Sequence, residues 1–283
     1  MKRLIIVVAI ISTACFQSAL AEGLSAEKEQ QLLEVIEGWG SGNPDVSLSH
    51  FFGYEPVKCA TPEILTIQYY VENASLRVQQ AYEQFINPRP ESAAPWNYPS
   101  ASGRFLVHFA KEGPHAPFGS DGTSVPDYVV SVARILDSVW GFEIDSLGYD
   151  TPPVDDFYAE GGDARYDVYL LDMITMGMGD AYGYSVPEKA SGSSYTYTSY
   201  IAIENDFAEI DAYIDKPLDA VRVTTAHEFF HAIQFGYDRL EFEDPIEGPR
   251  HHWFEMSAVW MEEQAYDEVN DYYLYLPIYY ENV

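Results

Sequence analysis

The residues of this sequence best suited to chemistry are two histidines four positions apart, His227 and His231, in the stretch HEFFH. On a helix this spacing places both imidazoles on one face, where they can bind one zinc ion at about 2.0–2.1 Å each. Glu228 follows His227 directly, so its carboxylate can meet a metal-bound water without binding the metal. Zinc makes such a water acidic, and a carboxylate can accept its proton. The pattern predicts a hydrolytic zinc centre with Glu228 as general base; a pair of core histidines is the alternative.

A third protein ligand is expected, because catalytic zinc sites usually have three and keep the fourth position open. We favour Glu255, because Glu255, Ala258 and Glu262 fall on one face of the next expected helix. There Glu255 can bind the metal, Ala258 can permit close packing, and Glu262 can orient a ligand histidine by a hydrogen bond. Three other residues remain candidates on chemistry alone: Asp238, His251 and His252.

These motifs carry a family resemblance. HEFFH followed by WFEMSAVWME resembles the gluzincins, whose third ligand is a glutamate in the pattern E-x-x-A-x-aromatic-x-E; the matching positions here are Glu255, Ala258, Trp260 and Glu262. The metzincin pattern is not met, because Gln234 and Tyr237 replace its glycine and last histidine. TTAHEFFHAIQFGYD and WFEMSAVWMEE, with KCATP, VPDYV and YDVYLLDM, are also similar to a group of uncharacterised exported bacterial proteins classed as metalloproteases. The resemblance covers most of residues 55–280 and implies peptide-bond hydrolysis.

Cys59 stands in the stretch KCATP, which is similar to the cysteine switch of latent matrix metalloproteinases. In those proteins a thiolate from a pro-segment fills the open zinc position, and a soft thiolate is a good zinc ligand. Cys59 lies well upstream of a Pro-rich stretch at 87–103, which has linker composition and is an expected cleavage region. Two interpretations stay open: a latency ligand, and a buried inert thiol.

The expected elements make an α+β fold of zincin type, with a twisted mixed sheet, the HExxH helix beneath it, and a following third-ligand helix. The strand at Ser199–Ile203 has the alternation of an edge strand, and we expect it to pair with extended substrate, which favours endopeptidase activity. Strands are expected at 104–110, 166–171 and 195–203, and helices at 62–85, 126–147, 216–236 (ending on Gly236) and 254–266.

The first residues have the pattern of a secretory signal peptide. Lys2 and Arg3 precede an apolar run from Leu4 to Ile11, which is too short to span a bilayer, and Ala19-Leu20-Ala21 fits a cleavage site. We therefore expect residues 1–21 to be a signal peptide and the protein to be secreted, extracellular and without a membrane partner once the signal is removed. Residues 22–100 are expected to form a helical pro-region or N-terminal subdomain, and residues 101–283 a catalytic domain that continues past this C-terminus.

The charge of the chain excludes one class of partner. There are 45 acidic and 15 basic residues, a formal net charge of -30, whereas nucleic-acid binding needs clustered Lys and Arg. A Ca²⁺ ion is a second candidate cofactor at an acidic loop around Gly161-Gly162, with a solvated loop as the alternative. The acidic residues there are Asp155, Asp156, Glu160, Asp163 and Asp167.

Together these features predict a secreted zinc metalloendopeptidase acting on a peptide or protein substrate. One alternative is a non-catalytic exported surface-binding module with a structural zinc, which four protein ligands would close. Another is a zinc hydrolase of non-peptide amides or esters. The donor that would stabilise the oxyanion is left undecided among four residues: Tyr237, His251, His252 and Tyr266.

Overall fold

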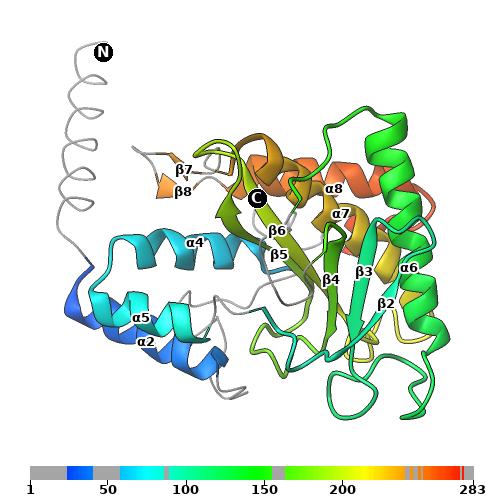
Figure 1. Ribbon diagram of the computed structural model, residues 1–283, viewed down its shortest axis with the longest axis horizontal. Helices are drawn as coiled ribbons and strands as arrows, with labels where there is room; N and C mark the ends of the chain where they lie inside the picture. Colours follow the sequence, from blue (N-terminus) through cyan, green and yellow to red (C-terminus); the bar gives the residue numbers. More distant parts are fainter. Residues whose placement is uncertain are drawn as a thin grey trace.

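The computed structural model describes residues 24–40, 58–85, 89–154, 163–239, 243–244, 248–249, 251–274 and 276. The expected signal peptide at 1–21 and the centre of the acidic loop at 155–162 lie outside these residues. Within them the chain is an α+β structure with a six-stranded mixed sheet (Figure 1). Among the helices of the described part, none is both long and apolar enough to cross a membrane.

The sheet has the strand order β1-β5-β6-β4-β3-β2, so β1 and β2 form its two edges. Three neighbouring strands, β6, β4 and β3, are parallel to one another, while β5 runs antiparallel to β6 and β2 antiparallel to β3. The short β1 pairs with β5 in parallel. The strands are β1 (Lys58–Cys59), β2 (Trp96–Pro99), β3 (Phe105–Phe109), β4 (Tyr166–Leu171), β5 (Ala181–Ala190) and β6 (Tyr197–Glu204).

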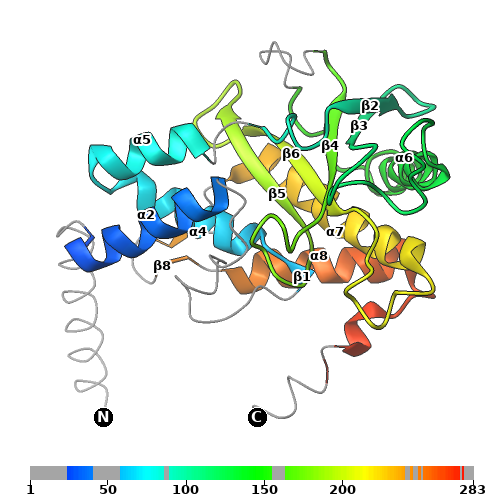
Figure 2. The ribbon, with the colours of Figure 1, turned by 90° about the horizontal axis from the view of Figure 1, so that it is seen from below.

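Both faces of the sheet are covered, because side chains alternate along a strand. In β4, Val168 and Leu170 belong to the core beneath α6 (Asp127–Trp140) and α7 (Pro217–Asp238). Tyr169 and Leu171 point to the opposite core, shared with α2 (Ala26–Gly40), α4 (Thr61–Glu72) and α5 (Leu76–Phe85). The latter three helices gather on one side of the sheet in Figure 2.

The strand predictions at 104–110, 166–171 and 195–203 are confirmed by β3, β4 and β6. The edge position expected for Ser199–Ile203 is wrong, because β6 lies between β5 and β4 and these residues are buried. The hydroxyl of Ser199 has its partner inside the protein, because it hydrogen bonds with the Tyr166 hydroxyl at 2.7 Å. The longest strand, β5, was not expected, and it supplies the neighbour that covers β6.

The helix expected over 62–85 is two helices, α4 and α5. Asn73 ends α4: its backbone N–H donates to the carbonyls of Tyr70 and Val71, and its side chain donates to the Tyr69 carbonyl at 3.1 Å. The linker expected at 87–103 is wrong at Trp96–Pro99, because β2 pairs there with β3. The N-terminal 100 residues therefore contribute both edges of the sheet.

The helix expected at 126–147 is α6 followed by a π-helical turn at Gly141–Ser146. The zinc-motif helix, α7, runs past Gly236 to Asp238, so the expected end at Gly236 is wrong. A Cβ at Gly236 would lie 3.3 Å from Pro153 Cδ, so the glycine permits close packing rather than ending the helix. The helix expected at 254–266 is α8 (His251–Tyr266), followed by the 3-10 turn η2 (Asp271–Leu274); β7 (Glu243–Asp244) and β8 (Gly248–Pro249) pair with each other between α7 and α8.

Gly183 lets β5 lie directly against α7. A Cβ at this position would stand 2.7 Å from the Ala202 carbonyl oxygen and 2.8 Å from Thr224 Cγ2, both closer than van der Waals contact. It would also lie 3.2 Å from Cγ of Glu228. The neighbouring backbone carbonyl cannot rotate away, so this position requires glycine for β5 to approach the zinc-motif helix.

We expect Gly183→Ala to lower the free energy of unfolding by about 1–3 kcal/mol, because the added methyl overpacks the sheet against α7. Urea denaturation measures this. The matched control is Gly141→Ala, where a Cβ meets no atom within 4 Å and the backbone φ is -59°, an ordinary helical value. The control should leave stability unchanged or raise it by up to about 1 kcal/mol, because alanine loses less conformational entropy than glycine on folding. Equal stability of the two variants would contradict the close packing inferred at Gly183.

Candidate metal centre

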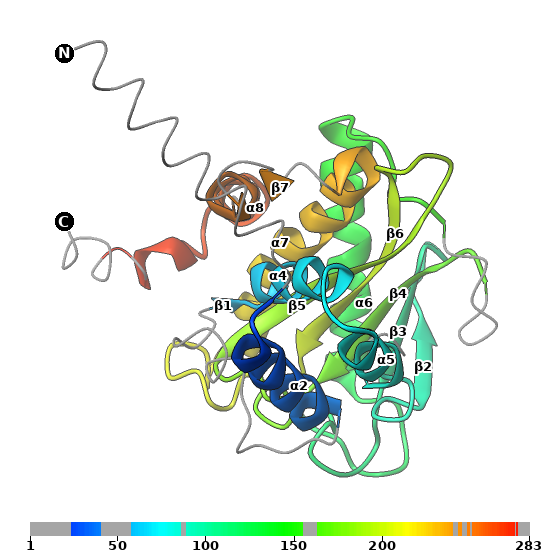
Figure 3. The ribbon, with the colours of Figure 1, turned by 90° about the vertical axis from the view of Figure 1, so that its left-hand side faces the viewer.

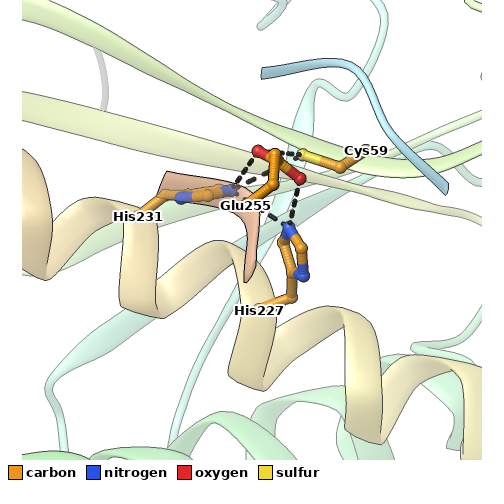
Figure 4. Close-up of side chains that lie close together, drawn as sticks. All are labelled: Cys59, His227, His231 and Glu255. Carbon is orange, nitrogen blue, oxygen red and sulfur yellow. Dashed lines mark hydrogen bonds and ion pairs between the residues drawn. The ribbon is translucent and has the colours of Figure 1, made fainter. Parts of the chain in front are cut away.

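The three residues expected to bind metal lie together, at the contact between α7 and α8 (Figure 4). Glu255 of α8 places one carboxylate oxygen 3.2 Å from His227 Nε2 and the other 3.1 Å from His231 Nε2. The two Nε2 atoms are 3.0 Å apart. Both imidazoles therefore direct the same nitrogen to a common point, as shared metal ligands would.

Cys59 of β1 adds a fourth candidate ligand to this cluster. Its Sγ lies 3.6 Å from His231 Nε2 and 3.8 Å from Glu255 Oε1, and the four ligand atoms all lie within 4.8 Å of one another. A tetrahedral zinc with ordinary Zn–N, Zn–O and Zn–S bonds separates its ligand atoms by about 3.3–3.8 Å. The donors present thus fit a zinc ion in type and number, and the three separations of 3.0–3.2 Å between nitrogen and oxygen ligands are a few tenths of an ångström shorter than a bound zinc would set.

The other nitrogen of each histidine is held by a hydrogen-bond partner. His227 Nδ1 is 2.6 Å from Glu262 Oε1, and this is the contact through which we expect Glu262 to orient the histidine. His231 Nδ1 is 2.7 Å from Gln234 Oε1, a contact that was not expected. Because Glu262 and Gln234 are acceptors at Nδ1, they fix the tautomer that leaves Nε2 for the metal.

Packing holds the two helices close enough for this geometry. Ala258 is fully buried at the α7–α8 contact, as its expected role requires. The ring of Phe254 stacks on His231, with centroids 4.2 Å apart and planes 3° from parallel. These contacts fix the ring of His231, so the ligand geometry is set by rigid helices rather than by loops.

Glu228 lies beside the cluster but is not part of it. Its Oε2 accepts hydrogen bonds from the Ser185 hydroxyl at 2.9 Å and the Thr61 hydroxyl at 3.1 Å. The Ser185 hydroxyl also lies 2.9 Å from the backbone carbonyl oxygen of Glu228. A buried carboxylate that is held in place beside the four candidate ligands, but outside their group, has the position that a general base would need.

A buried ionic network extends from the far side of Glu262. The ammonium of Lys58 is paired with both Glu262 and Asp271, and the Tyr213 hydroxyl hydrogen bonds to Asp271. Burial by itself would lower the pKa of Lys58, but the two carboxylates outweigh it and raise that pKa above its ordinary value. The sequence analysis did not identify Lys58, Asp271 or Tyr213, because the partners lie more than 200 residues apart in the Lys58–Glu262 and Lys58–Asp271 pairs.

The electrostatics of the cluster favour a cation. Burial would lower the pKa of His227, but Glu255 and Glu262 raise it to about 10. Burial would raise the pKa of Glu255, yet His231 and His227 hold it well below its usual range. Burial raises the pKa of the Cys59 thiol, and the charges of Glu228 and Glu255 raise it further. Without metal, the site therefore holds a proton on His227 at neutral pH.

The structure places some of the remaining candidate residues and leaves others undescribed. Asp238 is not a member of the four-ligand cluster, and the side chains of His251 and His252 are outside the described residues. The Tyr237 hydroxyl accepts a hydrogen bond from the Asp150 amide at 3.0 Å, and Tyr266 hydrogen bonds to Ser138. These contacts do not choose between the two tyrosines as the oxyanion donor.

The acidic loop proposed for Ca²⁺ is described only at its C-terminal end. Asp163 pairs with Arg165, its Oδ1 lying 2.8 Å from Arg165 Nε. Asp167 is buried in β4, bonded to Arg89 and, at 2.7 Å, to His108 Nε2. Both of its oxygens have partners inside the protein, and the rest of the expected Ca²⁺ loop, residues 155–162, lies outside the described residues.

Comparison with protein-family models, with curated proteins and with solved structures finds no match to this chain.

We expect zinc affinity to rise with pH between about pH 6 and about pH 9, because the ion must displace the proton that His227 holds below its pKa of about 10. Zinc binding should release protons over this range. Isothermal titration calorimetry in two buffers of different ionisation enthalpy measures both quantities. An affinity independent of pH would contradict the protonated metal-free cluster.

Glu262→Gln should weaken zinc binding by about 10- to 100-fold, because it replaces the charged partner of His227 Nδ1 while preserving shape. Competition with a chromogenic chelator measures the affinity. Glu268→Gln, at an exposed position just after α8, is the matched control and should bind zinc like the wild type. Equal affinities in the two variants would show that Glu262 does not support the metal site.

Proposed function

We propose that this chain is a secreted zinc-dependent peptidase of gluzincin type, with a zincin-like fold. One observation carries the proposal: His227, His231 and Glu255 converge through Nε2 and carboxylate atoms on one point, while Glu228 is held beside that point without joining it. Two features support a zincin-like fold. Strand β5 is antiparallel to β6 and lies next to the motif helix, and the candidate third ligand is on the following helix. The signal-like N-terminus of the sequence supports secretion.

His227, His231 and Glu255 would hold the zinc, which when bound supplies a polarised water and a Lewis acid for the peptide carbonyl. Glu228 takes the proton of the attacking water on its carboxylate and passes it to the nitrogen of the leaving amine. The hydroxyls of Ser185 and Thr61 orient that carboxylate. Glu262 keeps His227 in the tautomer that binds through Nε2.

A second candidate, a non-catalytic module with a structural zinc, is favoured by Cys59. Four protein donors would close the coordination sphere, which is the usual state of a structural zinc. Against it stands Glu228, whose buried carboxylate a purely structural site would not require. The peptidase remains the better account because it uses both the ligand set and this carboxylate.

The test is peptide hydrolysis by wild type and by Glu228→Gln at equal zinc content, using casein and a quenched peptide library. Because a thiol stands at the fourth position, both chains are also made with Cys59→Ser. In the Cys59→Ser background, Glu228→Gln should reduce the rate by about 10²–10⁴-fold, the usual contribution of a general base. Glu112→Gln, an exposed glutamate, is the control and should leave the rate unchanged. Equal rates of hydrolysis with and without Glu228→Gln would contradict the proposed mechanism.

A further inference from the structure

The segment Lys58–Thr61 contacts the candidate metal ligands, the carboxylate behind them and the expected general base. Cys59 stands at the fourth ligand position, Lys58 is paired with the carboxylate that orients His227, and Thr61 hydrogen bonds to Glu228. We propose that this segment is an inhibitor built into the chain, which keeps the peptidase latent until the segment is displaced. The inference rests on the proposed function, because it concerns regulation of the same site.

The segment occupies the edge of the sheet beside the metal centre. Lys58 is in register with Ala181 and Cys59 with Gly183, and the Ala60 amide donates to the Gly183 carbonyl at 3.1 Å. Without β1, the outer edge of β5 has free backbone groups, and Gly183 packs against Glu228. An extended peptide pairs with such an edge by adding a strand. The inhibitor thus fills the backbone position that a substrate would use.

The thiol blocks the chemistry itself. Cys59 presents Sγ to the cluster, so a side-chain atom and not a peptide carbonyl takes the fourth corner. A Cys59 thiolate bound to zinc would displace the water that the reaction consumes, and Glu228 would then have no proton to accept. Since the thiol belongs to the same chain, its effective concentration at the metal is high. Latency follows without any separate inhibitor.

Lys58 fixes the segment at a point behind the metal ligands. Its backbone has a φ of 72°, in the left-handed region that non-glycine residues rarely adopt. Its side chain reaches the buried carboxylates of Glu262 and Asp271, while the next side chain, Cys59, reaches the cluster. Strained backbone of this kind persists only where surrounding contacts hold it, and it concentrates at functional sites.

Helix α4 covers the segment and continues its contacts. Gln68 donates to the Pro187 carbonyl of β5 at 3.0 Å, and Leu65 packs with Phe235 of α7 and Phe254 of α8. Figure 3 shows α4 beside α7 and β5. Phe254 also stacks on His231, so Leu65 of α4 packs against the ring that holds this candidate metal ligand in place. Displacing β1 and the start of α4 would open the fourth position, the β5 edge and Glu228 together.

The test uses the full chain with cobalt(II) in place of zinc, and reads coordination separately from activity. The wild type should show a near-ultraviolet sulfur-to-cobalt charge-transfer band, which Cys59→Ser should lack. Zinc-loaded Cys59→Ser should hydrolyse peptides at least about tenfold faster than the wild type, and Cys59→Ser with Glu228→Gln should lose that gain. Cys59→Ala repeats the test with no hydroxyl to replace the thiol. Urea denaturation verifies that each variant is folded.

The outcomes separate this inference from the function beneath it. No sulfur band in the wild type, or equal Glu228-dependent rates with and without Cys59, would overturn latency and leave the peptidase standing. A sulfur band with no Glu228-dependent hydrolysis in any variant would refute the peptidase, and latency with it, in favour of a structural zinc bound by four protein donors. The band together with faster hydrolysis in both Cys59 variants supports the inhibitor.

Discussion

The constraint on which the rest of this structure depends is the charge of its buried centre. Glu228, Glu262 and Asp271 are almost fully buried and Glu255 is partly buried, all within one connected cluster. Carboxylates leave water at high cost unless cations or hydrogen-bond donors replace it. Lys58 supplies one fixed positive charge, and in the absence of metal a proton on His227 supplies another. A divalent ion at the convergence of Nε2 atoms would replace that proton with a stronger and better placed charge.

The fold meets this constraint by placing two carboxylates of one helix, α8, at the two nitrogens of His227. Glu255 and Glu262 are seven residues apart on α8, two helical turns, so both face α7. The first approaches Nε2 and the second Nδ1 of the same ring. Such geometry requires α8 to lie close along α7, which buried Ala258 permits, and α7 to lie close to β5, which Gly183 permits. Two small residues thus set the position of the charged ones.

The sequence predicts the site residues that are related by the geometry of a single helix. It does not predict contacts between residues that are far apart in the chain. Residues four apart on one helix, and seven apart on the next, follow from helical geometry, so the histidines, Glu255 and Glu262 could be placed in advance. The pairing of Lys58 with Asp271 could not, because no local pattern relates a residue of β1 to one after α8. Strand β5 was overlooked because its Gly183 and Pro187 argue against a strand, although glycine there serves close packing. Without β5, the pattern of Ser199–Ile203 predicts an edge strand, whereas β5 pairs along that side and β1 lies beyond it at the edge.

The contacts of β1 determine how strongly Cys59 is kept at the fourth ligand position. Strand β1 has two residues and an irregular register, and so short a strand contributes little stability by itself. Its hold on the site comes from the Lys58 ion pairs, the metal–sulfur bond it would make, and the packing of α4. Helix α4 is held at two places, because Leu65 packs with Phe235 and Phe254 while Ile64, Ile67 and Val71 belong to the core that α4 shares with α2 and α5. Release of the segment therefore requires the Lys58 ion pairs to break and the start of α4 to leave Phe235 and Phe254, after which water could reach Cys59 and compete for a bound metal.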